Sequence, residues 1–480
     1  MYDLLIKNGT VIDGTGGCRR HLDVAVLEGV IAKVESDICE KALNTIDAAE
    51  LVVAPGFIDV HTHDDRLLLC SPDMVPKVSQ GVTTVVGGNC GVSLAPLKGV
   101  DPPPPMNLLG GQEWYRFRSV REYREELQTA GMAVNCVMLV GHSTLRAGVM
   151  NELGRAATEA EINKMKTIMV DALEDGCAGL STGLAYPTAS SASTSEVISL
   201  AKELGNRGDL GGIYVSHIRD EGDFLIESVD EALEIGIQAD VPVVISHHKS
   251  TGAANWGKTR KTLEMISRAR KSQTVHFDVY PYIASSTVLL PQFIESADRV
   301  KVTWSESFPE MGGKFLHKIC EQWACDLESA VAQLQPAGAI YFEIDEQEMR
   351  HLLKQPGTMI GSDGLPHDQF PHPRLWGTFP RIVGYYAREL KLFSVEQAIH
   401  QMTGLTASVF GLEGRGVIRQ GNYADFVIFN ENKIIDLADF DNPVQPSAGI
   451  HSVIVNGQLV WRNGASSGAR PGKWLQRSSL

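Results

Sequence analysis

Residues 56–63 read GFIDVHTH, an apolar run that ends in two histidines. Seven later apolar runs also end in polar or metal-capable side chains: VTTVVGGNC (82–90), VNCVMLVGH (134–142), GLSTGLAY (179–186), GIYVSHIRDE (212–221), VPVVISHHK (241–249), TVHFDVYPY (274–282) and TMIGSDG (358–364). Helix-like stretches separate these runs, which is the pattern of βα units on a parallel sheet. Eight such units predict a closed (β/α)8 barrel, the TIM barrel, in which side chains at the strand ends gather at one face.

The two ends of the chain follow a different pattern. Residues 1–56 and 415–480 alternate apolar and polar side chains between turn signals, which predicts short antiparallel strands. Within GIHSVIVNGQLVWRNG (449–464), the pair Asn456-Gly457 predicts a type I′ hairpin turn. We expect the two ends to form one small β-sandwich beside a barrel of residues 57–414.

One connection within the barrel is longer than the others. The link between Tyr282 and Met359 carries helix and strand patterns of its own. A connection of this length is uncommon between neighbouring barrel elements. We therefore predict an inserted subdomain, residues 284–355, over the mouth of the barrel.

Composition and charge exclude several classes of protein. The 480 residues are 43% hydrophobic and 21% charged, the balance of a globular chain with a large domain and a smaller module. A net charge of −15 without any basic block argues against binding to nucleic acid or to an anionic membrane. No apolar run approaches the roughly 20 residues that span a bilayer, and the first residues lack a secretory pattern. With eight scattered cysteines and no CxxC pair, we expect a cytoplasmic protein.

Histidines at the strand ends predict a metal site. His61 and His63 are two residues apart on a strand, so both side chains face the same way and can share a metal. His217 and His247 end the fifth and sixth strands, and barrel closure brings such positions together. Imidazole suits zinc, although each histidine alone could be structural. His248 faces the other way, and a register error of one residue would exchange it with His247.

Five motifs carry a resemblance to a known family. GFIDVHTH, GNCG (88–91), SHIRDE (216–221), SHHK (246–249) and GSDGLPHD (361–368) occur in this order. Over essentially its whole length the chain resembles the D-aminoacylase branch of the amidohydrolase superfamily. The resemblance implies zinc-dependent hydrolysis of the amide bond of N-acyl-D-amino acids to a carboxylate and a free D-amino acid. The preference for D-amino acids rests on this resemblance alone.

The resemblance also implies roles for individual residues. It implies a tightly held zinc bound by Cys90, His217 and His247, with His61 and His63 as a second, weaker metal position. Asp363 becomes the catalytic carboxylate, which accepts a proton from the attacking water and delivers it to the departing amine. Without the resemblance, a lone cysteine is most often a buried apolar residue, and an aspartate in GSDG can be a turn residue.

Two alternative functions remain open. The first is a cyclic amidohydrolase of the hydantoinase or dihydroorotase kind, which resembles this chain at the first strand but bridges two metals through a lysine after strand four. GLSTGLAY (179–186) has no lysine, which disfavours this alternative. The second is a barrel retained as a non-catalytic scaffold, which would have lost ligands, whereas all the expected positions are present.

Substrate contacts follow from the chemistry of an N-acyl amino acid. Arg374, in the loop after strand eight, offers a guanidinium fork for the α-carboxylate. Tyr280, Tyr282 and Ser286 can add hydroxyl donors, and Tyr186 can polarise the scissile carbonyl. Each of these residues could instead serve packing.

The side chain of the substrate is predicted from charge. Lys249 stands beside His247, while Arg299 and Lys301 begin the insertion. These three cations favour an acidic side chain, with N-acyl-D-glutamate a better substrate than its methionine or leucine counterparts. Exposed lysines are, however, often simply solvated.

Overall fold

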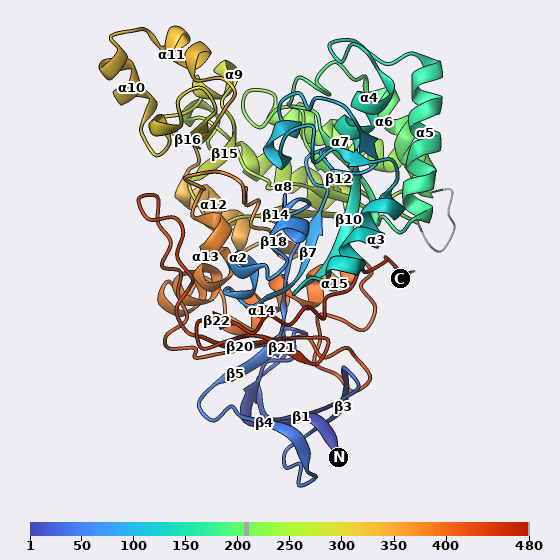
Figure 1. Ribbon diagram of the computed structural model, residues 1–480, viewed down its shortest axis with the longest axis vertical. Coiled ribbons are helices and arrows are strands. Elements are labelled where there is room, and N and C mark those ends of the chain that lie inside the picture. Colours follow the sequence, from blue (N-terminus) through green and yellow to red (C-terminus); the bar gives the residue numbers. More distant parts are fainter. Residues whose placement is uncertain (206–210, 479–480) are drawn as a thin grey trace.

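The computed structural model describes residues 1–205 and 211–478. It has three parts, which Figure 1 arranges along its long axis. A sheet built from both chain ends lies at the lower end, the barrel occupies the middle, and an insertion projects at the upper left. Within the described ranges, no helix combines the length and the apolar character needed to cross a membrane.

Eight parallel strands form the barrel, one from each predicted run. They are β6 (Phe57–Asp59), β7 (Val82–Gly87), β10 (Asn135–Gly141), β11 (Gly179–Gly183), β12 (Ile213–His217), β13 (Val243–Ile245), β14 (Val275–Val279) and β18 (Thr358–Ile360). Each strand pairs with the next along this order. A parallel bridge between Thr62 and Gly364 joins the last strand to the first, and the Asp363 amide donates to the His61 carbonyl at 2.8 Å. The predicted (β/α)8 barrel is therefore confirmed.

Helices flank the strands, and most present an apolar face to them. The longer ones are α3 (Val120–Ala130), α4 (His142–Val149), α5 (Glu159–Glu174), α6 (Thr194–Gly205), α7 (Leu225–Ala239), α8 (Lys258–Ala269), α12 (Glu346–Leu353), α13 (Arg374–Arg381), α14 (Val395–Met402) and α15 (Gly404–Val409). Shorter segments are α1 (Leu67–Cys70), α2 (Val75–Val78), β8 (Leu97–Lys98), β9 (Arg116–Phe117), η1 (Met106–Leu109), η3 (Ala253–Asn255) and the π-helical η5 (Ile382–Glu389).

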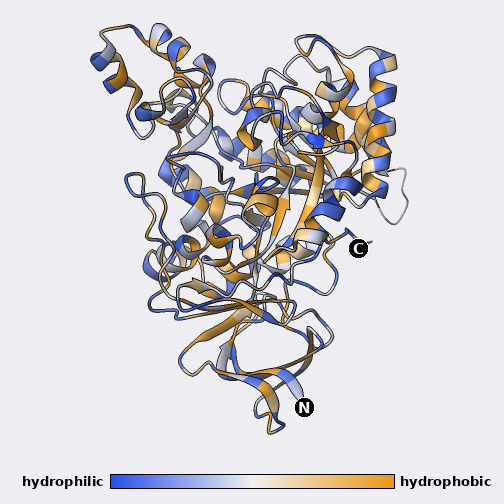
Figure 2. Ribbon diagram, in the orientation of Figure 1, coloured by the Kyte–Doolittle hydropathy of each residue, from blue (hydrophilic) through white to orange (hydrophobic). Residues whose placement is uncertain are grey.

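Helix α5 shows how the sequence sets these elements. The Thr158 side chain accepts from the Glu161 amide, and the Glu161 carboxylate accepts from the Thr158 amide at 2.8 Å, which is a capping box. Met165 and Met169, four residues apart, are buried on the inner face. Figure 2 shows the same division more broadly, with hydrophobic barrel strands and helices that are hydrophilic on one side.

The two chain ends meet in one nine-stranded sheet. Its strands are β1 (Tyr2–Val11), β2 (Arg20–Leu27), β3 (Val30–Glu35), β4 (Ala42–Asp47), β5 (Val52–Pro55), β19 (Phe426–Phe429), β20 (Ile450–Val455), β21 (Gln458–Arg462) and β22 (Ala465–Ser466). Antiparallel pairing of β5 with β19 joins the ends. Asn456 (φ 48°) and Gly457 (φ 80°) lie between β20 and β21, as a type I′ turn requires. The structure therefore forms the predicted small β domain as one continuous sheet. The limits of this domain, 1–56 and 415–480, stay a prediction, and residues 479–480 lie outside the described ranges.

The insertion has a small sheet and core of its own. Strands β15 (Ala284–Val288), β17 (Ala337–Phe342) and β16 (Arg299–Ser305) pair antiparallel in this order. Helices α9 (Pro291–Ile294), α10 (Leu316–Trp323) and α11 (Leu327–Leu334), together with η4 (Pro309–Met311), accompany them. Helix α12 instead contacts the barrel strand β14. The predicted limits of the insertion, 284–355, remain a prediction.

Candidate active site and metal centre

The candidate metal ligands lie at or just beyond the C-terminal ends of five barrel strands. They are His61 and His63 after β6, Cys90 after β7, His217 at the end of β12, His247 after β13 and Asp363 after β18. All six side chains are buried. Loops after parallel strands converge at this face of a barrel, so residues far apart in sequence meet there.

Three of these residues have an unusual backbone conformation. Cys90 (φ 52°), His247 (φ 35°) and Asp363 (φ 51°) occupy the left-handed region, which disfavours residues with a Cβ. Such conformations cost about 1–3 kcal/mol each and are concentrated at functional sites. Their convergence on one point indicates that the fold sustains them for the side chains they present.

One group of donors consists of Cys90, His217 and His247. The ring atoms His247 Nε2 and His217 Nδ1 are 3.0 Å apart, and His247 Nε2 is 3.5 Å from Cys90 Sγ. The three donor atoms all lie within 4.8 Å of one another, close enough to coordinate a single ion. One sulfur and two imidazole nitrogens form a set that suits zinc.

A second group shares Cys90 and adds the other predicted ligands. His61 Nε2 lies 3.2 Å from Cys90 Sγ, and His63 Nε2 lies 3.2 Å from Asp363 Oδ1. These four donor atoms are also within 4.8 Å of one another. The shared sulfur places the two groups side by side, so the donors fit either one ion or an adjacent pair.

Electrostatics keep both anionic donors of the centre charged. Burial opposes ionisation of the Cys90 thiol, but His61 and the hydrogen bonds from His217 and His247 hold its pKa well below the usual value. Burial likewise opposes ionisation of Asp363, yet Arg374 and His61 hold the pKa of that carboxyl well below its ordinary range. A thiolate ligand and a carboxylate proton acceptor are therefore both available.

Two carboxylates that the sequence reasoning missed orient the histidines. Glu221 Oε1 lies 2.9 Å from His247 Nδ1, on the far side of the ring from the donor cluster. Asp278 accepts from the His247 amide at 2.9 Å and lies 3.4 Å from His61 Nδ1. Carboxylates in this position fix ring orientation and tautomer in metal sites. Both residues stand in quoted runs, Glu221 in SHIRDE and Asp278 in TVHFDVYPY.

The ambiguity between two neighbouring histidines is resolved by their contacts. His247 points into the donor cluster, whereas His248 Nε2 lies 2.8 Å from Thr262 Oγ1 on helix α8. Burial lowers the pKa of His248 to about 4, so its ring is neutral. The structure therefore brings His247, and not His248, to the candidate site.

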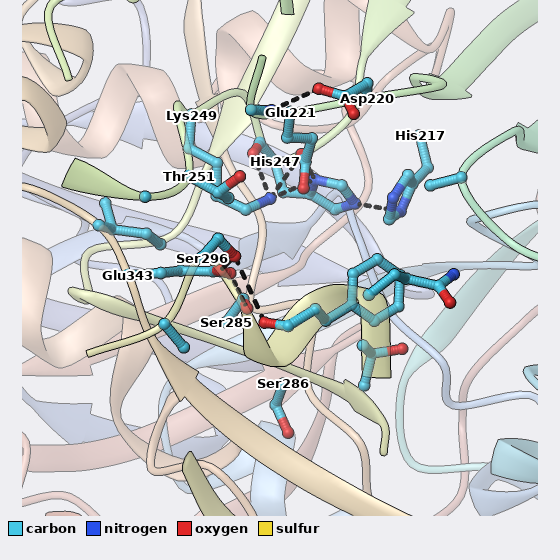
Figure 3. Close-up of a pocket in the computed structure, with 18 of the residues that line it drawn as sticks. His217, Asp220, Glu221, His247, Lys249, Thr251, Ser285, Ser286, Ser296 and Glu343 are labelled. Carbon is cyan, nitrogen blue, oxygen red and sulfur yellow. Dashed lines mark hydrogen bonds and ion pairs between the residues drawn. The ribbon is translucent and has the colours of Figure 1, made fainter. Parts of the chain in front are cut away.

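A pocket of about 1080 Å³ opens beside the cluster. Four of the predicted substrate residues line it, namely Tyr186, Lys249, Tyr280 and Ser286. Lys249 Nζ donates to Glu221 at 2.6 Å, next to His247 (Figure 3). Within the described chain the buried Tyr280 hydroxyl has no hydrogen-bond partner, which leaves it free for a ligand.

The hydroxyls of the other two predicted residues, Tyr186 and Ser286, already have partners. Tyr186 Oη lies 2.9 Å from Thr287 Oγ1, and Ser286 Oγ donates to the Ala339 carbonyl at 3.2 Å. Either hydroxyl would have to share or exchange its present contact in order to bind a ligand.

The remaining two predicted substrate residues lie behind the pocket wall. Tyr282 is not among the lining residues; its ring packs against His372 (5.1 Å between centroids) and under the Arg381 guanidinium (4.9 Å). Tyr282 therefore lies behind the pocket surface, and its contact with substrate stays a prediction.

Arg374 is fully buried, donates to the Ser286 carbonyl at 3.0 Å and pairs with Asp363 Oδ2 at 3.0 Å. In the described structure, its Nε and Nη1 atoms have no partner. The charged partner of Arg374 in the structure is thus the Asp363 carboxylate.

The three cations behind the acidic side-chain expectation lie in different places. Lys249 and Arg299 line the pocket, but Lys301 does not, because its ammonium donates to the Phe440 carbonyl at 2.5 Å. Arg299 stacks over the Phe342 ring at 4.6 Å. Two of the three cations behind the acidic side-chain prediction therefore line the pocket, and the third does not.

Fold and site together define a class of protein. The closed (β/α)8 barrel brings a thiol, imidazoles and a carboxylate together beside a pocket at its C-terminal face. This arrangement is that of a barrel enzyme with a metal centre. The chain belongs to the amidohydrolase family, whose model matches residues 44–281 and 321–461.

Full-length relatives narrow this class. The D-aminoacylase of Alcaligenes xylosoxydans xylosoxydans is 48% identical over 479 residues, which cover 100% of this chain and 98% of the relative. The N-acyl-D-aspartate deacylase of the same organism is 47% identical, with 98% and 95% covered. A crystal structure of the N-acyl-D-glutamate deacylase from Bordetella bronchiseptica, with zinc and a phosphonate mimic of the tetrahedral intermediate, matches with a TM-score of 0.94 at 43% identity over 99% of both chains. The resemblance to the D-aminoacylase branch is confirmed.

Proposed function

We propose that this protein hydrolyses the amide bond of N-acyl-D-amino acids, releasing a carboxylate and a free D-amino acid at a zinc centre. One observation carries the proposal: the metal donors and the Asp363 carboxylate meet beside a pocket of about 1080 Å³. The full-length relatives, by name a D-aminoacylase, an N-acyl-D-aspartate deacylase and an N-acyl-D-glutamate deacylase, support the choice of substrate and of handedness.

Cys90, His217 and His247 would hold the tight zinc, and His61 and His63 a second, weaker ion. The bound zinc in the Bordetella bronchiseptica relative supports this identity of the metal. When bound, zinc supplies Lewis acidity that activates water and polarises the scissile carbonyl. Glu221 keeps the His247 ring turned toward the ion through its contact with Nδ1.

Asp363 would carry the proton transfers. Because its pKa is held low, its carboxylate is unprotonated when substrate arrives. It accepts a proton from the attacking water and returns it to the nitrogen of the departing D-amino acid. Contacts with His63 and Arg374 at 3.2 and 3.0 Å hold the carboxylate in position for both transfers.

The α-carboxylate of the substrate would lie against Lys249 and the unpartnered Tyr280 hydroxyl. Arg374, with two free guanidinium nitrogens behind this wall, adds positive charge. Tyr186 and Ser286 are proposed to contact the acyl carbonyl or the backbone of the substrate. The eight free thiols support a reducing, cytoplasmic setting.

Metal analysis combined with a substrate screen tests this function. Protein purified without added zinc should contain about one zinc per chain. It should hydrolyse N-acetyl-D-amino acids but not their L enantiomers or a hydantoin. Cys90→Ala should lose both the zinc and the activity, whereas Cys177→Ala, a buried thiol outside the cluster, should keep both. A Cys90→Ala protein that retained zinc and turnover would remove Cys90 from the centre.

A further inference from the structure

Glu343 is a buried carboxylate on the insertion side of the pocket. It directly follows β17, is 7% exposed and belongs to the pocket lining. The hydroxyls of Ser285 and Ser296 donate to its two carboxylate oxygens, Ser296 at 2.8 Å. Its carbonyl accepts from the Gly252 amide and from Trp256 Nε1, both at 3.0 Å. Both ends of the residue are therefore fixed.

The two walls of the pocket face one another across the substrate space. Figure 3 shows Glu343, Ser285 and Ser296 on one side, and Lys249 with His247 on the other. A D-amino acid derivative presents three groups from its α-carbon. With the amide at the donor cluster and the carboxylate at Lys249, the side chain is left to meet the insertion wall.

Within the described residues, the cations that line the pocket are paired with carboxylates, whereas the Glu343 carboxylate is not paired with a cation. Its cations each lie beside a carboxylate already: Lys249 with Glu221 at 2.6 Å, Arg219 with Glu231 at 2.8 Å and Arg299 with Asp298 at 3.4 Å. Glu343, by contrast, forms no salt bridge with any residue in the described part of the chain; its bonded neighbours are neutral hydroxyls. The pocket thus holds a fixed carboxylate without a cation.

We propose that Glu343 is a specificity-determining residue that binds a cationic substrate side chain, so that N-acyl derivatives of D-lysine and D-arginine are preferred to those of D-glutamate. The inference rests on the proposed deacylase function and replaces the acidic side-chain expectation. Burial raises the pKa of Glu343 to about 7, against the opposing effect of the two serine hydrogen bonds. A bound ammonium or guanidinium would offset that desolvation by pairing with the ionised form.

Three matched substrates test this role in the zinc-loaded enzyme. N-acetyl-D-norleucine has the N-acetyl-D-lysine side chain without the amine, and N-acetyl-D-glutamate reverses its charge. The lysine derivative should exceed norleucine in kcat/KM by about ten- to a hundredfold, with glutamate lowest. Glu343→Gln, which retains the shape and a hydrogen-bonding carbonyl, should remove that advantage while norleucine turnover is kept.

Two further variants serve as controls for the role of the Glu343 charge. Glu346→Gln removes the same charge three residues away, where the side chain pairs with Arg350 on the surface, and should leave the ratio of lysine to norleucine unchanged. Glu343→Met, uncharged and similar in size, should favour norleucine. The inference would be overturned if Glu343→Gln left the ratio of lysine to norleucine kcat/KM unchanged, or if the unmodified enzyme preferred the glutamate derivative. In either case, hydrolysis of the norleucine derivative would still support the deacylase function. Failure to hydrolyse any D-substrate would overturn both.

Discussion

The two walls of the pocket are built in different ways. The barrel wall takes its donors from the ends of five strands, and the left-handed backbone at Cys90, His247 and Asp363 fixes them. The insertion wall takes Ser285 from β15 and Glu343 from the position directly after β17, and hydrogen bonds between side chains hold them. In the proposed function the barrel wall would contact the amide common to all substrates, and the insertion wall the side chain that differs between them. Chemistry and side-chain selection can therefore change independently.

The largest effect should come from the barrel wall. Asp363→Asn preserves the shape of the side chain but removes the proton acceptor, so kcat should fall by at least about a hundredfold for every D-substrate. Zinc content should be unchanged because the Cys90, His217 and His247 donors remain. Metal analysis and steady-state kinetics on the same preparation measure both quantities. Two results would assign Asp363 a structural role instead. One is a variant that fails to fold, and the other is a variant that loses zinc but keeps normal turnover for each zinc ion that remains.

A smaller effect should appear at the insertion wall as the pH changes. With a pKa of about 7, Glu343 is ionised above that pH and protonated below it. The Ser285 and Ser296 hydroxyls face this carboxylate, and Lys249 and Glu221 are the charged groups that act on it from the barrel side. The substrate lysine stays cationic throughout this range, so its advantage over norleucine should shrink as the pH falls from about 8 to about 6.

The ratio of the two kcat/KM values isolates this titration, because ionisations at the donor cluster affect both substrates alike. In Glu343→Gln the ratio should be flat with pH. A ratio that still fell with acidification in that variant would assign the titration to another group.

The barrel was predictable because each strand ends in a recognisable side chain. Strand order and closure then follow from topology, and these bring His61, Cys90 and Asp363 together although they are far apart in sequence. Tyr282, unlike Tyr280, does not line the pocket, and the reason is local. Strand β14 ends at Val279, and the chain turns through Pro281, so Tyr282 no longer shares the direction of Tyr280.

The insertion wall could not be predicted in the same way. Glu343 meets its partners Ser285 and Ser296 across 58 and 47 residues of chain, and no strand-end pattern links them. Lys301 was expected near the pocket because it is close to Arg299 in sequence, but its ammonium donates to the Phe440 carbonyl instead. Side chains held by tertiary hydrogen bonds leave no periodic signal.

The division between the two walls is tested most directly by comparing Arg374→Ala with Glu343→Gln on the same two substrates. Arg374 contacts Asp363 and stands behind the proposed carboxylate site, both of which serve every substrate. Its removal should lower kcat/KM for N-acetyl-D-lysine and N-acetyl-D-norleucine by the same factor, about ten- to a hundredfold. Glu343→Gln should lower only the lysine value. Equal losses in Glu343→Gln, or a loss confined to one substrate in Arg374→Ala, would contradict the account.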